Sequence, residues 1–287
     1  MSLEIRALSF NVAGSADMQY RFAKKYRDVA FDPVEIENHY KKLTIETFEK
    51  IGRDFLPSFM CLQEITRSEH QFLIDFLEKM GFTVLQKYGT AVCFQNSQFI
   101  CLDHQMTLND DTGALYADLR LKGTKKIIRV VSSHLPGFNV SKMTQSPHAV
   151  KVGDSALEAQ LTTVDTAKRV FSTFFSCFSE VNTPNFIFYG LDANTTADFV
   201  SEKVHPERLT PLFMHGFVPD IHDIKATIID DSTGHPYRYD YLFCKCVNGS
   251  ATVQNCEIEG INNQAMLGDP DKAMSDHLPV LARLYLL

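Results

Sequence analysis

The stretch Ser275-Asp276-His277-Leu278-Pro279-Val280 places an acid and an imidazole directly before an apolar run. That run, residues 279–286, predicts a strand. Five other short blocks likewise attach polar side chains to strand-like apolar runs: Leu8-Ser9-Phe10-Asn11-Val12, Cys61-Leu62-Gln63-Glu64-Ile65, Val131-Ser132-Ser133-His134-Leu135, Gly190-Leu191-Asp192-Ala193-Asn194 and Arg238-Tyr239-Asp240-Tyr241-Leu242-Phe243. The shared pattern predicts one site assembled at strand ends that lie far apart in the sequence.

Length and composition are those of an ordinary globular protein. The chain has 287 residues, of which 45% are hydrophobic and 22% are charged. A chain of this length buries roughly three quarters of its extended surface, so its core needs no disulfide to hold it. Because the six blocks span residues 11–277, a site built from them implies one domain over residues 1–287.

The net charge limits the binding partners that the protein can have, and the cysteine content indicates the cellular compartment in which it works. The formal net charge of −7 argues against a broadly basic nucleic-acid surface, although local basic residues with bound divalent cations can still hold a phosphate. The seven cysteines are an odd number and lie mostly in apolar runs, which predicts buried free thiols in a reducing compartment. The sequence shows no secretory signal and no apolar run long enough to span a membrane. We therefore expect a cytoplasmic protein, and we expect a monomer.

The apolar patterns predict more strands than helices. Helical spacing covers 35–55, 68–80 and 156–179, and 197–215 looks helical or mixed. Strand-like runs cover 4–12, 60–64, 82–86, 90–95, 98–102, 115–121, 127–134, 185–191, two parts of 226–246, about 251–259 and 279–286. Strands and helices do not alternate strictly, as a doubly wound parallel sheet would require. We therefore predict an α/β (α+β) sandwich of two sheets with helices outside.

The polar residues of the six blocks suit the hydrolysis of a phosphate ester. That reaction needs a divalent cation, a positioned water, neutralisation of the phosphoryl charge and protonation of the leaving group. Mg²⁺ prefers hard oxygen ligands and is typically held by one or two carboxylates plus the substrate phosphate. The blocks supply four acids, two amides and two imidazoles, namely Glu64, Asp192, Asp240, Asp276, Asn11, Asn194, His134 and His277.

The order and chemistry of these blocks resemble the endonuclease/exonuclease/phosphatase superfamily, whose members are metal-dependent phosphoesterases. The resemblance implies a four-layer sandwich, in which two packed and mainly antiparallel β-sheets are flanked by helices. It also implies Mg²⁺ or Mn²⁺ as the cofactor. Glu64 stands in the Leu-Gln-Glu block as the main metal ligand, and Asn11 and Asp276 are expected at the metal with it.

The resemblance implies catalytic roles for five further residues. Asp192 would orient or deprotonate the attacking water, and Asn194 would donate a hydrogen bond to a phosphoryl oxygen. His277 would contact the phosphoryl group as a donor or proton carrier, and Asp240 would fix its tautomer and charge. His134 would bind the phosphate or protonate the leaving oxygen.

Some features of the sequence separate the branches of the superfamily, and one departs from the pattern that the family commonly shows. Val131-Ser132-Ser133-His134-Leu135 looks like the Ser/Thr-His-Leu form of the pancreatic deoxyribonuclease, neutral sphingomyelinase, deadenylase and tyrosyl-DNA phosphodiesterase branches. Thr195-Thr196 stands where inositol-polyphosphate phosphatases carry Arg, and the absence of Trp disfavours the apurinic endonucleases. In Gly190-Leu191-Asp192 a residue separates Gly from Asp, whereas the family commonly has them adjacent.

The substrate is less sharply defined than the chemistry. Segments 13–50 and 136–155 are polar and attached to catalytic strand ends, so we expect substrate elements there. A basic-aromatic cluster in the first segment, which could follow a nucleic-acid backbone or an anionic lipid surface or form a solvated helix face, consists of Arg21, Lys24, Lys25, Tyr26 and Arg27.

We expect a Mg²⁺-dependent phosphoesterase that acts on a phosphodiester in a nucleic acid or nucleotide, with single-stranded nucleic acid among the partners. One alternative is a phospholipid or another phosphate ester as the substrate. A second alternative, from another class, is a catalytically silent family member that serves as a binding module. A silent relative should have lost a metal or base residue, and none of these residues is missing from the blocks.

Overall fold

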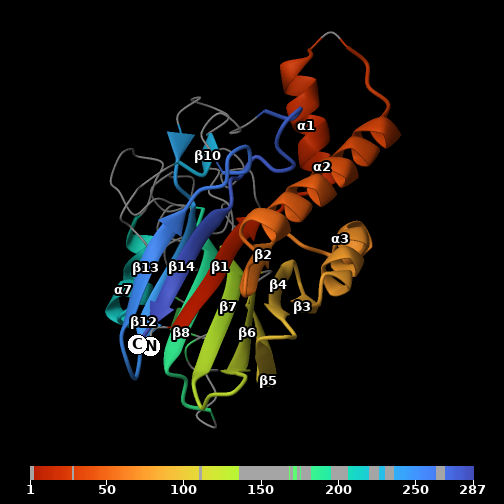
Figure 1. Ribbon diagram of the computed structural model, residues 1–287. Coiled ribbons are helices and arrows are strands. Elements are labelled where there is room, and N and C mark those ends of the chain that lie inside the picture. The colour runs from red at the N-terminus through yellow and green to blue at the C-terminus, as the bar shows by residue number, and fades with distance from the viewer. Residues whose placement is uncertain are drawn as a thin grey trace.

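The computed structural model describes residues 3–27, 29–109, 112–135, 168, 171–172, 175, 182–194, 206–219, 226–229, 236–262 and 269–287 (Figure 1). The first six-stranded sheet has the order β13 (Ala251–Cys256), β14 (Val280–Leu286), β1 (Leu3–Asn11), β2 (Phe59–Gln63), β4 (Thr90–Gln95) and β3 (Phe82–Lys87). The second has the order β5 (Phe99–Asn109), β6 (Thr112–Leu121), β7 (Ile127–His134), β8 (Phe186–Asp192), β12 (Asp240–Cys246) and β9 (Val218–Pro219).

Both sheets are mainly antiparallel, as expected, and each contains one parallel pair near its centre. In the first sheet β1 runs parallel to β2, and in the second β7 runs parallel to β8. The other neighbours are antiparallel, including β1 with β14 and β8 with β12. The carboxyl ends of two parallel strands lie at the same edge of a sheet, so each parallel pair brings two strand ends together.

The two sheets pack face to face around a shared apolar layer. Successive side chains of a strand point to opposite faces, so alternate residues enter this layer. In β1, Ile5 and Ala7 lie between the sheets, whereas Leu8 and Phe10 face outward. The inner faces of other strands contribute Phe59, Val92, Leu119, Val130, Phe188, Leu242 and Leu284.

Helices cover the outer faces and complete four layers. α2 (Pro33–Asp54) and α3 (Arg67–Lys79) pack on the outer face of the first sheet through Phe48, Ile51 and Leu73. α2 begins where the Asp32 side chain accepts a hydrogen bond from the Val34 N–H, with proline as the first helical residue. The outer face of the second sheet meets Phe171, Leu212 and Leu209, the last two from α7 (Thr210–Met214) and η1 (Pro206–Leu209). The predicted four-layer sandwich is therefore confirmed.

Two parts of the chain differ from the expected elements. The sequence patterns predict no helix or strand over residues 15–34, but Ser15–Lys25 form α1, which lies against α2 beyond one end of the sheets (Figure 1). Within 226–246 the structure has a small sheet of β10 (Ile228–Ile229) and β11 (Pro236–Tyr237), with β12 as a separate strand. Most of the helix expected at 156–179, and the segment 136–155, lie outside the described residues. No described helix meets the length and hydropathy that a membrane span requires.

Candidate active site

The eight residues singled out in the sequence meet at one edge of the sandwich. The carboxyl ends of the two parallel pairs carry Asn11, Glu64, His134 and Asp192. β12 runs antiparallel to β8, so its first residue, Asp240, lies opposite Asp192. β14 runs antiparallel to β1 and places residues 275–279 beside the same edge. The two chain termini lie at the opposite end of the sandwich (Figure 1).

The sheets approach closely just below this edge, and Gly190 makes that approach possible. A Cβ atom at position 190 would lie 2.2 Å from the Cys61 Cβ and 2.9 Å from the Ser9 Oγ of the opposite sheet. Gly190 and Asp192 are two residues apart in β8, so both face the space between the sheets. Leu191 between them therefore faces outward, into the apolar cluster on the outer face of the second sheet.

The Asn11 amide joins the two sheets. Its Nδ2 donates hydrogen bonds to Glu64 Oε1 at 2.9 Å and to Asp192 Oδ2 at 2.8 Å. Its Oδ1 accepts a hydrogen bond from the Ala13 N–H at 2.9 Å. An amide nitrogen has two hydrogens, and both are used here to hold one carboxylate of each sheet. Asn11 is fully buried, whereas the Glu64 side chain is 42% exposed.

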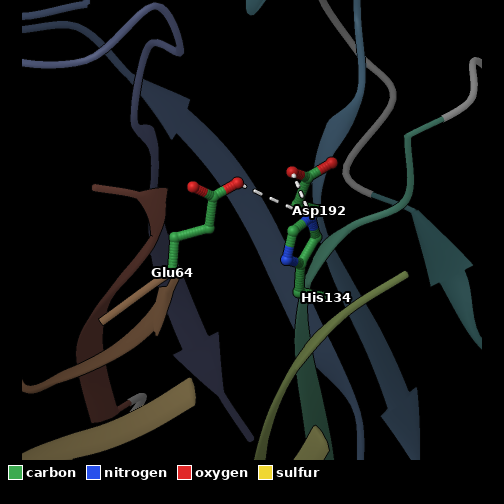
Figure 2. A group of neighbouring side chains, drawn as sticks. All are labelled: Glu64, His134 and Asp192. Atoms are coloured by element: carbon green, nitrogen blue, oxygen red, sulfur yellow. Dashed lines mark ion pairs between the residues drawn. The ribbon is translucent and has the colours of Figure 1, made fainter. Parts of the chain in front are cut away.

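His134 faces the same two carboxylates from β7 (Figure 2). Its Nε2 lies 3.3 Å from Asp192 Oδ2 and 3.8 Å from Glu64 Oε1. The Asn194 amide nitrogen lies 2.9 Å from the same Nε2 and also donates to the Leu135 carbonyl at 2.8 Å. Asn194 adopts φ 46 and donates its backbone N–H to Asp192 Oδ1 at 2.9 Å, so one tight turn positions both residues.

His277 and Asp240 form a buried pair on the other side of Asp192. The His277 Nδ1 lies 2.7 Å from Asp240 Oδ2. Burial alone would lower the pKa of His277, but the carboxylates of Asp240, Asp276 and Asp192 outweigh it and hold that pKa well above its usual range. Burial also raises the pKa of Asp240 and the imidazolium opposes that shift, so we place the proton on His277. The Nε2 of His277 lies 3.9 Å from both Asp192 Oδ2 and Asp276 Oδ1.

The donor set at Glu64 fits a hard divalent cation. Single ligand atoms of Glu64, His134 and Asp192 all lie within 4.8 Å of one another, and carboxylate oxygens are the ligands that Mg²⁺ and Mn²⁺ prefer. The exposure of Glu64 leaves room for a cation that keeps several waters. Asn11 presents its amide nitrogen here, and Asp276 approaches from the His277 side, so the metal-ligand roles of these two residues stay predictions.

Sequence patterns did not reveal Arg208, which lies behind the site. Its side chain is fully buried, and its Nη1 donates to the Asn194 carbonyl at 3.0 Å. Burial lowers the pKa of Arg208 to about 10, against the raising effect of Asp192. A buried cation at this position supports the negative charge of Asp192. Neither apolar periodicity nor a motif marks Arg208 in the sequence.

Asp17 is a second residue that the patterns did not reveal. Burial and the nearby carboxylate of Asp276 raise the pKa of Asp17 to about 6. Asp17 accepts a hydrogen bond from Arg21, which also donates to the carbonyls of Ala273 and Met274 at 3.1 and 2.9 Å. Arg21 therefore ties α1 to the loop that leads into Ser275-Asp276-His277.

The basic-aromatic cluster takes part in this attachment. Besides the buried Arg21, Lys25 forms ion pairs with Asp269 and Asp271, and the Tyr26 hydroxyl donates to Asp271. These three members of the cluster thus bind the loop at 269–274. The expectation that they meet a substrate stays a prediction, because their described partners belong to the chain itself.

The sequence matches no protein-family model and no curated protein sequence. Solved structures match it over nearly its whole length. An endonuclease/exonuclease/phosphatase from Bacteroides vulgatus has a TM-score of 0.61 and 14% identity, covering 99% of this chain and 100% of that one. ANGEL2, described as a 2′,3′-cyclic phosphatase in complex with adenosine-2′,3′-vanadate, has a TM-score of 0.62 and 15% identity, covering 99% and 96%. D. rerio TDP2 complexed with single strand DNA product has a TM-score of 0.59 and 13% identity, covering 98% of each chain.

At these identities the likeness establishes the architecture. The same two packed sheets and flanking helices hold the eight residues at one edge. The chain therefore has the fold of the endonuclease/exonuclease/phosphatase superfamily, as the resemblance of its six sequence blocks indicated.

Proposed function

We propose that this protein is a divalent-metal-dependent phosphoesterase that hydrolyses a phosphodiester in a nucleic acid or nucleotide. One observation carries the proposal. The Asn11 amide holds the Glu64 and Asp192 carboxylates together, and the Asp240-paired imidazole of His277 lies beside them. A phosphoryl group needs cationic and donor groups on its oxygens and a base for its attacking water, and this edge supplies both.

Each side chain has a task that follows from its contacts. A cation held at Glu64 would neutralise charge on the phosphoryl oxygens and polarise the phosphorus. Asp192 accepts hydrogen bonds from Asn11 and Asn194, which aims its carboxylate to orient the water and take its proton. The His277 imidazolium donates to a phosphoryl oxygen through Nε2, while Asp240 keeps its proton on the ring.

His134 and Asn194 complete the phosphate side of the site. Their side-chain nitrogens lie 2.9 Å apart, and they follow the ends of the neighbouring parallel strands β7 and β8, so both can face the same phosphoryl group. We assign His134 to the phosphoryl group and keep protonation of the leaving oxygen as its alternative role. The nucleic-acid or nucleotide substrate is supported by the ligands of two structures with this fold, an adenosine vanadate and a single-strand DNA product.

Three further expectations remain proposals. We propose one domain over residues 1–287, because the described strands of both sheets share the inter-sheet core. We propose a cytoplasmic location, which the free cysteines support, Cys61, Cys93 and Cys244 being buried. We also propose that the protein acts as a monomer.

A substrate and metal panel tests the proposed function. The purified chain is assayed on single-stranded DNA, single-stranded RNA, a 2′,3′-cyclic nucleotide, sphingomyelin and a phosphoinositide, each with Mg²⁺, Mn²⁺, Zn²⁺ or chelator. We expect hydrolysis of a nucleic-acid or nucleotide ester with Mg²⁺ or Mn²⁺, loss of activity in chelator and no recovery with Zn²⁺ alone. Hydrolysis confined to the lipids would favour the phospholipid alternative. Binding without hydrolysis of any ester would favour the binding module.

A further inference from the structure

The turn after β1 contains a residue in an unfavourable backbone conformation. Ala13 has φ 48, in the left-handed region that side chains with a Cβ rarely adopt. It is 2% exposed and follows Asn11 by two residues, so this backbone conformation lies directly beside the candidate active site. Such a conformation persists only where surrounding contacts hold it.

Two buried side chains hold the Ala13 carbonyl. The Tyr40 hydroxyl of α2 lies 3.1 Å from the Ala13 oxygen, and the His70 Nε2 of α3 lies 2.8 Å from it. Tyr40 and His70 are also in contact with each other, at 2.7 Å between hydroxyl and Nε2. Tyr40 is 1% exposed and His70 is fully buried, so water does not compete for these bonds.

The protonation of both groups suits donation to a carbonyl. The Thr66 N–H donates to His70 Nδ1 at 3.2 Å, so a neutral ring carries its hydrogen on Nε2, the atom that faces Ala13. Burial lowers the pKa of His70 and keeps the ring neutral. Burial also raises the pKa of Tyr40, so its hydroxyl keeps the hydrogen that it donates.

The preceding peptide unit, which joins the Val12 carbonyl to the Ala13 N–H, faces Asn11, and the Tyr40 hydroxyl also lies 3.4 Å from the Val12 oxygen. The Ala13 N–H donates to Asn11 Oδ1, which fixes the end of the amide that turns toward the carboxylates. The amide nitrogen is thereby left to bridge Glu64 and Asp192. A rotation at Ala13 that turned the Val12–Ala13 peptide would release Oδ1 and let the amide turn, which would place an oxygen against two carboxylates.

A third contact secures the far side of the turn. The Glu69 carboxylate accepts hydrogen bonds from the backbone N–H and the hydroxyl of Ser15. A Cβ atom at Gly14 would lie 2.6 Å from Glu69 Oε1, so the carboxylate reaches this position only because residue 14 is glycine. Two successive residues near the start of α3, Glu69 and His70, therefore hydrogen-bond to the segment between β1 and α1.

We propose that Tyr40 and His70 are positioning residues for the candidate active site, holding Ala13 so that its N–H orients the Asn11 amide between Glu64 and Asp192. The inference rests on the proposed function for its effect on catalysis. The alternative is that the pair only fills space, since Tyr40 also packs edge-on against Phe72. The two roles differ in their dependence on single hydrogen-bonding atoms.

The positioning role and the space-filling role can be distinguished by substitutions that keep the shape of the side chain but remove one hydrogen bond. Tyr40→Phe retains the ring, and the matched control Tyr189→Phe removes a buried hydroxyl that lies 2.7 Å from Ser133 Oγ on the outer face of the second sheet. We expect kcat on the preferred ester to fall about 10-fold to 10²-fold in Tyr40→Phe, with KM within about 2-fold. The control should stay within about 2-fold of wild type. Equal losses in the two variants would overturn the positioning role.

Two replacements of His70 test which ring nitrogen matters. In His70→Gln the side-chain nitrogen can occupy the place of Nε2 and donate to Ala13, whereas in His70→Asn the side-chain oxygen can only replace Nδ1 toward Thr66. We expect His70→Gln to keep at least about 10-fold more activity than His70→Asn. The reverse order at similar thermal midpoints would contradict the proposal.

Hydrogen exchange tests the same relay without activity. In protein labelled with ¹⁵N-asparagine, the Asn11 side-chain signal is assigned by its absence in Asn11→Ser. We expect Tyr40→Phe to exchange this NH₂ group at least about 10-fold faster than wild type or Tyr189→Phe, because the bonds that hold it open more often. Unchanged exchange would overturn the inference. A wild-type protein inactive on every ester would instead overturn the proposed function, and the exchange result would still decide the relay.

Discussion

The two parallel strand pairs present the same topology but opposite environments. The end of β1–β2 carries Glu64, whose side chain is 42% exposed, and two helices, α2 and α3, hold the adjoining residue Ala13. The end of β7–β8 carries Asp192, whose side chain is 1% exposed and lies beside the Asp240–His277 pair. A hydrated cation can reach the first end at little desolvation cost, whereas the second holds fixed charges away from water. Under the proposed function, the comparison divides this edge into an exposed cation half at Glu64 and a buried proton half at Asp192.

The largest effect is expected in the buried half. Asp192→Asn keeps the size of the side chain but removes the proton acceptor, so kcat should fall by about 10³–10⁴-fold. Steady-state kinetics at saturating Mg²⁺ measures the loss, and the thermal midpoint shows whether the fold survives. A loss below 10-fold would mean that the proton leaves the water by another route.

The next effect concerns the charge of His277. The carboxylates of Asp240, Asp276 and Asp192 raise the pKa of His277. The positive charge of the imidazolium is therefore fully present below the ordinary pKa of histidine, and it is lost only as pH rises through the raised pKa. Activity should therefore persist above neutral pH and fall at alkaline pH. Asp240→Asn should move this alkaline limb to lower pH and reduce kcat by about 10²-fold.

A double-variant cycle checks whether the two residues act as a pair. The losses from Asp240→Asn and His277→Ala should be strongly non-additive, because a residue that works through its partner has little left to lose. The pH–rate profile of each variant shows where activity falls at alkaline pH. The kcat/KM of the double variant, compared with those of the single variants, gives the coupling free energy between Asp240 and His277. If the losses were additive and the alkaline fall in activity stayed at the same pH, Asp240 and His277 would not act as a pair.

A smaller effect is expected in the exposed half. Glu64→Gln should weaken the affinity for Mg²⁺ or Mn²⁺, and added metal should restore part of the activity. We expect an increase of about 10- to 10²-fold in the metal concentration at half activity. Glu37→Gln, which removes an exposed acid paired with Lys41 on α2, is the matched control. The same metal dependence in both variants would remove Glu64 from the cation half.

The smallest effect is expected at the close contact between the two sheets, where Gly190 lies against Cys61. Gly190→Ala places a Cβ against the Cβ of Cys61, and overpacking of this kind destabilises a core by about 1–3 kcal/mol. Chemical denaturation measures the change in unfolding free energy. Cys61→Gly in the same chain removes the two nearest clashing atoms but leaves the Ser9 Oγ, so it should recover part of the lost stability. No destabilisation by Gly190→Ala would show that the sheets separate readily here.

Most of the fold and the eight site residues could be read from the sequence because both follow strand periodicity. Apolar runs mark the strands, and a polar residue at the end of a run reports the edge of a sheet. α1 lacked such a signal, since its buried face includes Arg21 alongside Met18 and Phe22. Arg21 becomes a core residue only through carbonyls of residues 273–274, some 250 positions away.

The remaining site features were hidden for a related reason. Tyr40 and His70 sit in ordinary helical patterns, and only the packing of α2 and α3 brings them to the Ala13 carbonyl. Arg208 reaches Asn194 from a short 3₁₀ turn that no pattern marks. Such contacts depend on how elements pack, whereas the six blocks depend only on where strands end.

The position of β1 between β2 and β14 has a consequence for how the protein forms. Leu3 pairs with Leu286, and the Ser275 hydroxyl donates to the Asn11 carbonyl, so the earliest and latest described strands are neighbours. Strands so far apart in the sequence pair slowly, because the entropy cost of closing a large loop comes before the favourable contacts between the strands form. On the ribosome, β1 can pair early with β2, but nearly the whole of this sequence must emerge before β1 gains its second partner, β14. Until then the candidate active site lacks Asp276 and His277, so under the proposed function a nascent chain would carry no hydrolytic activity.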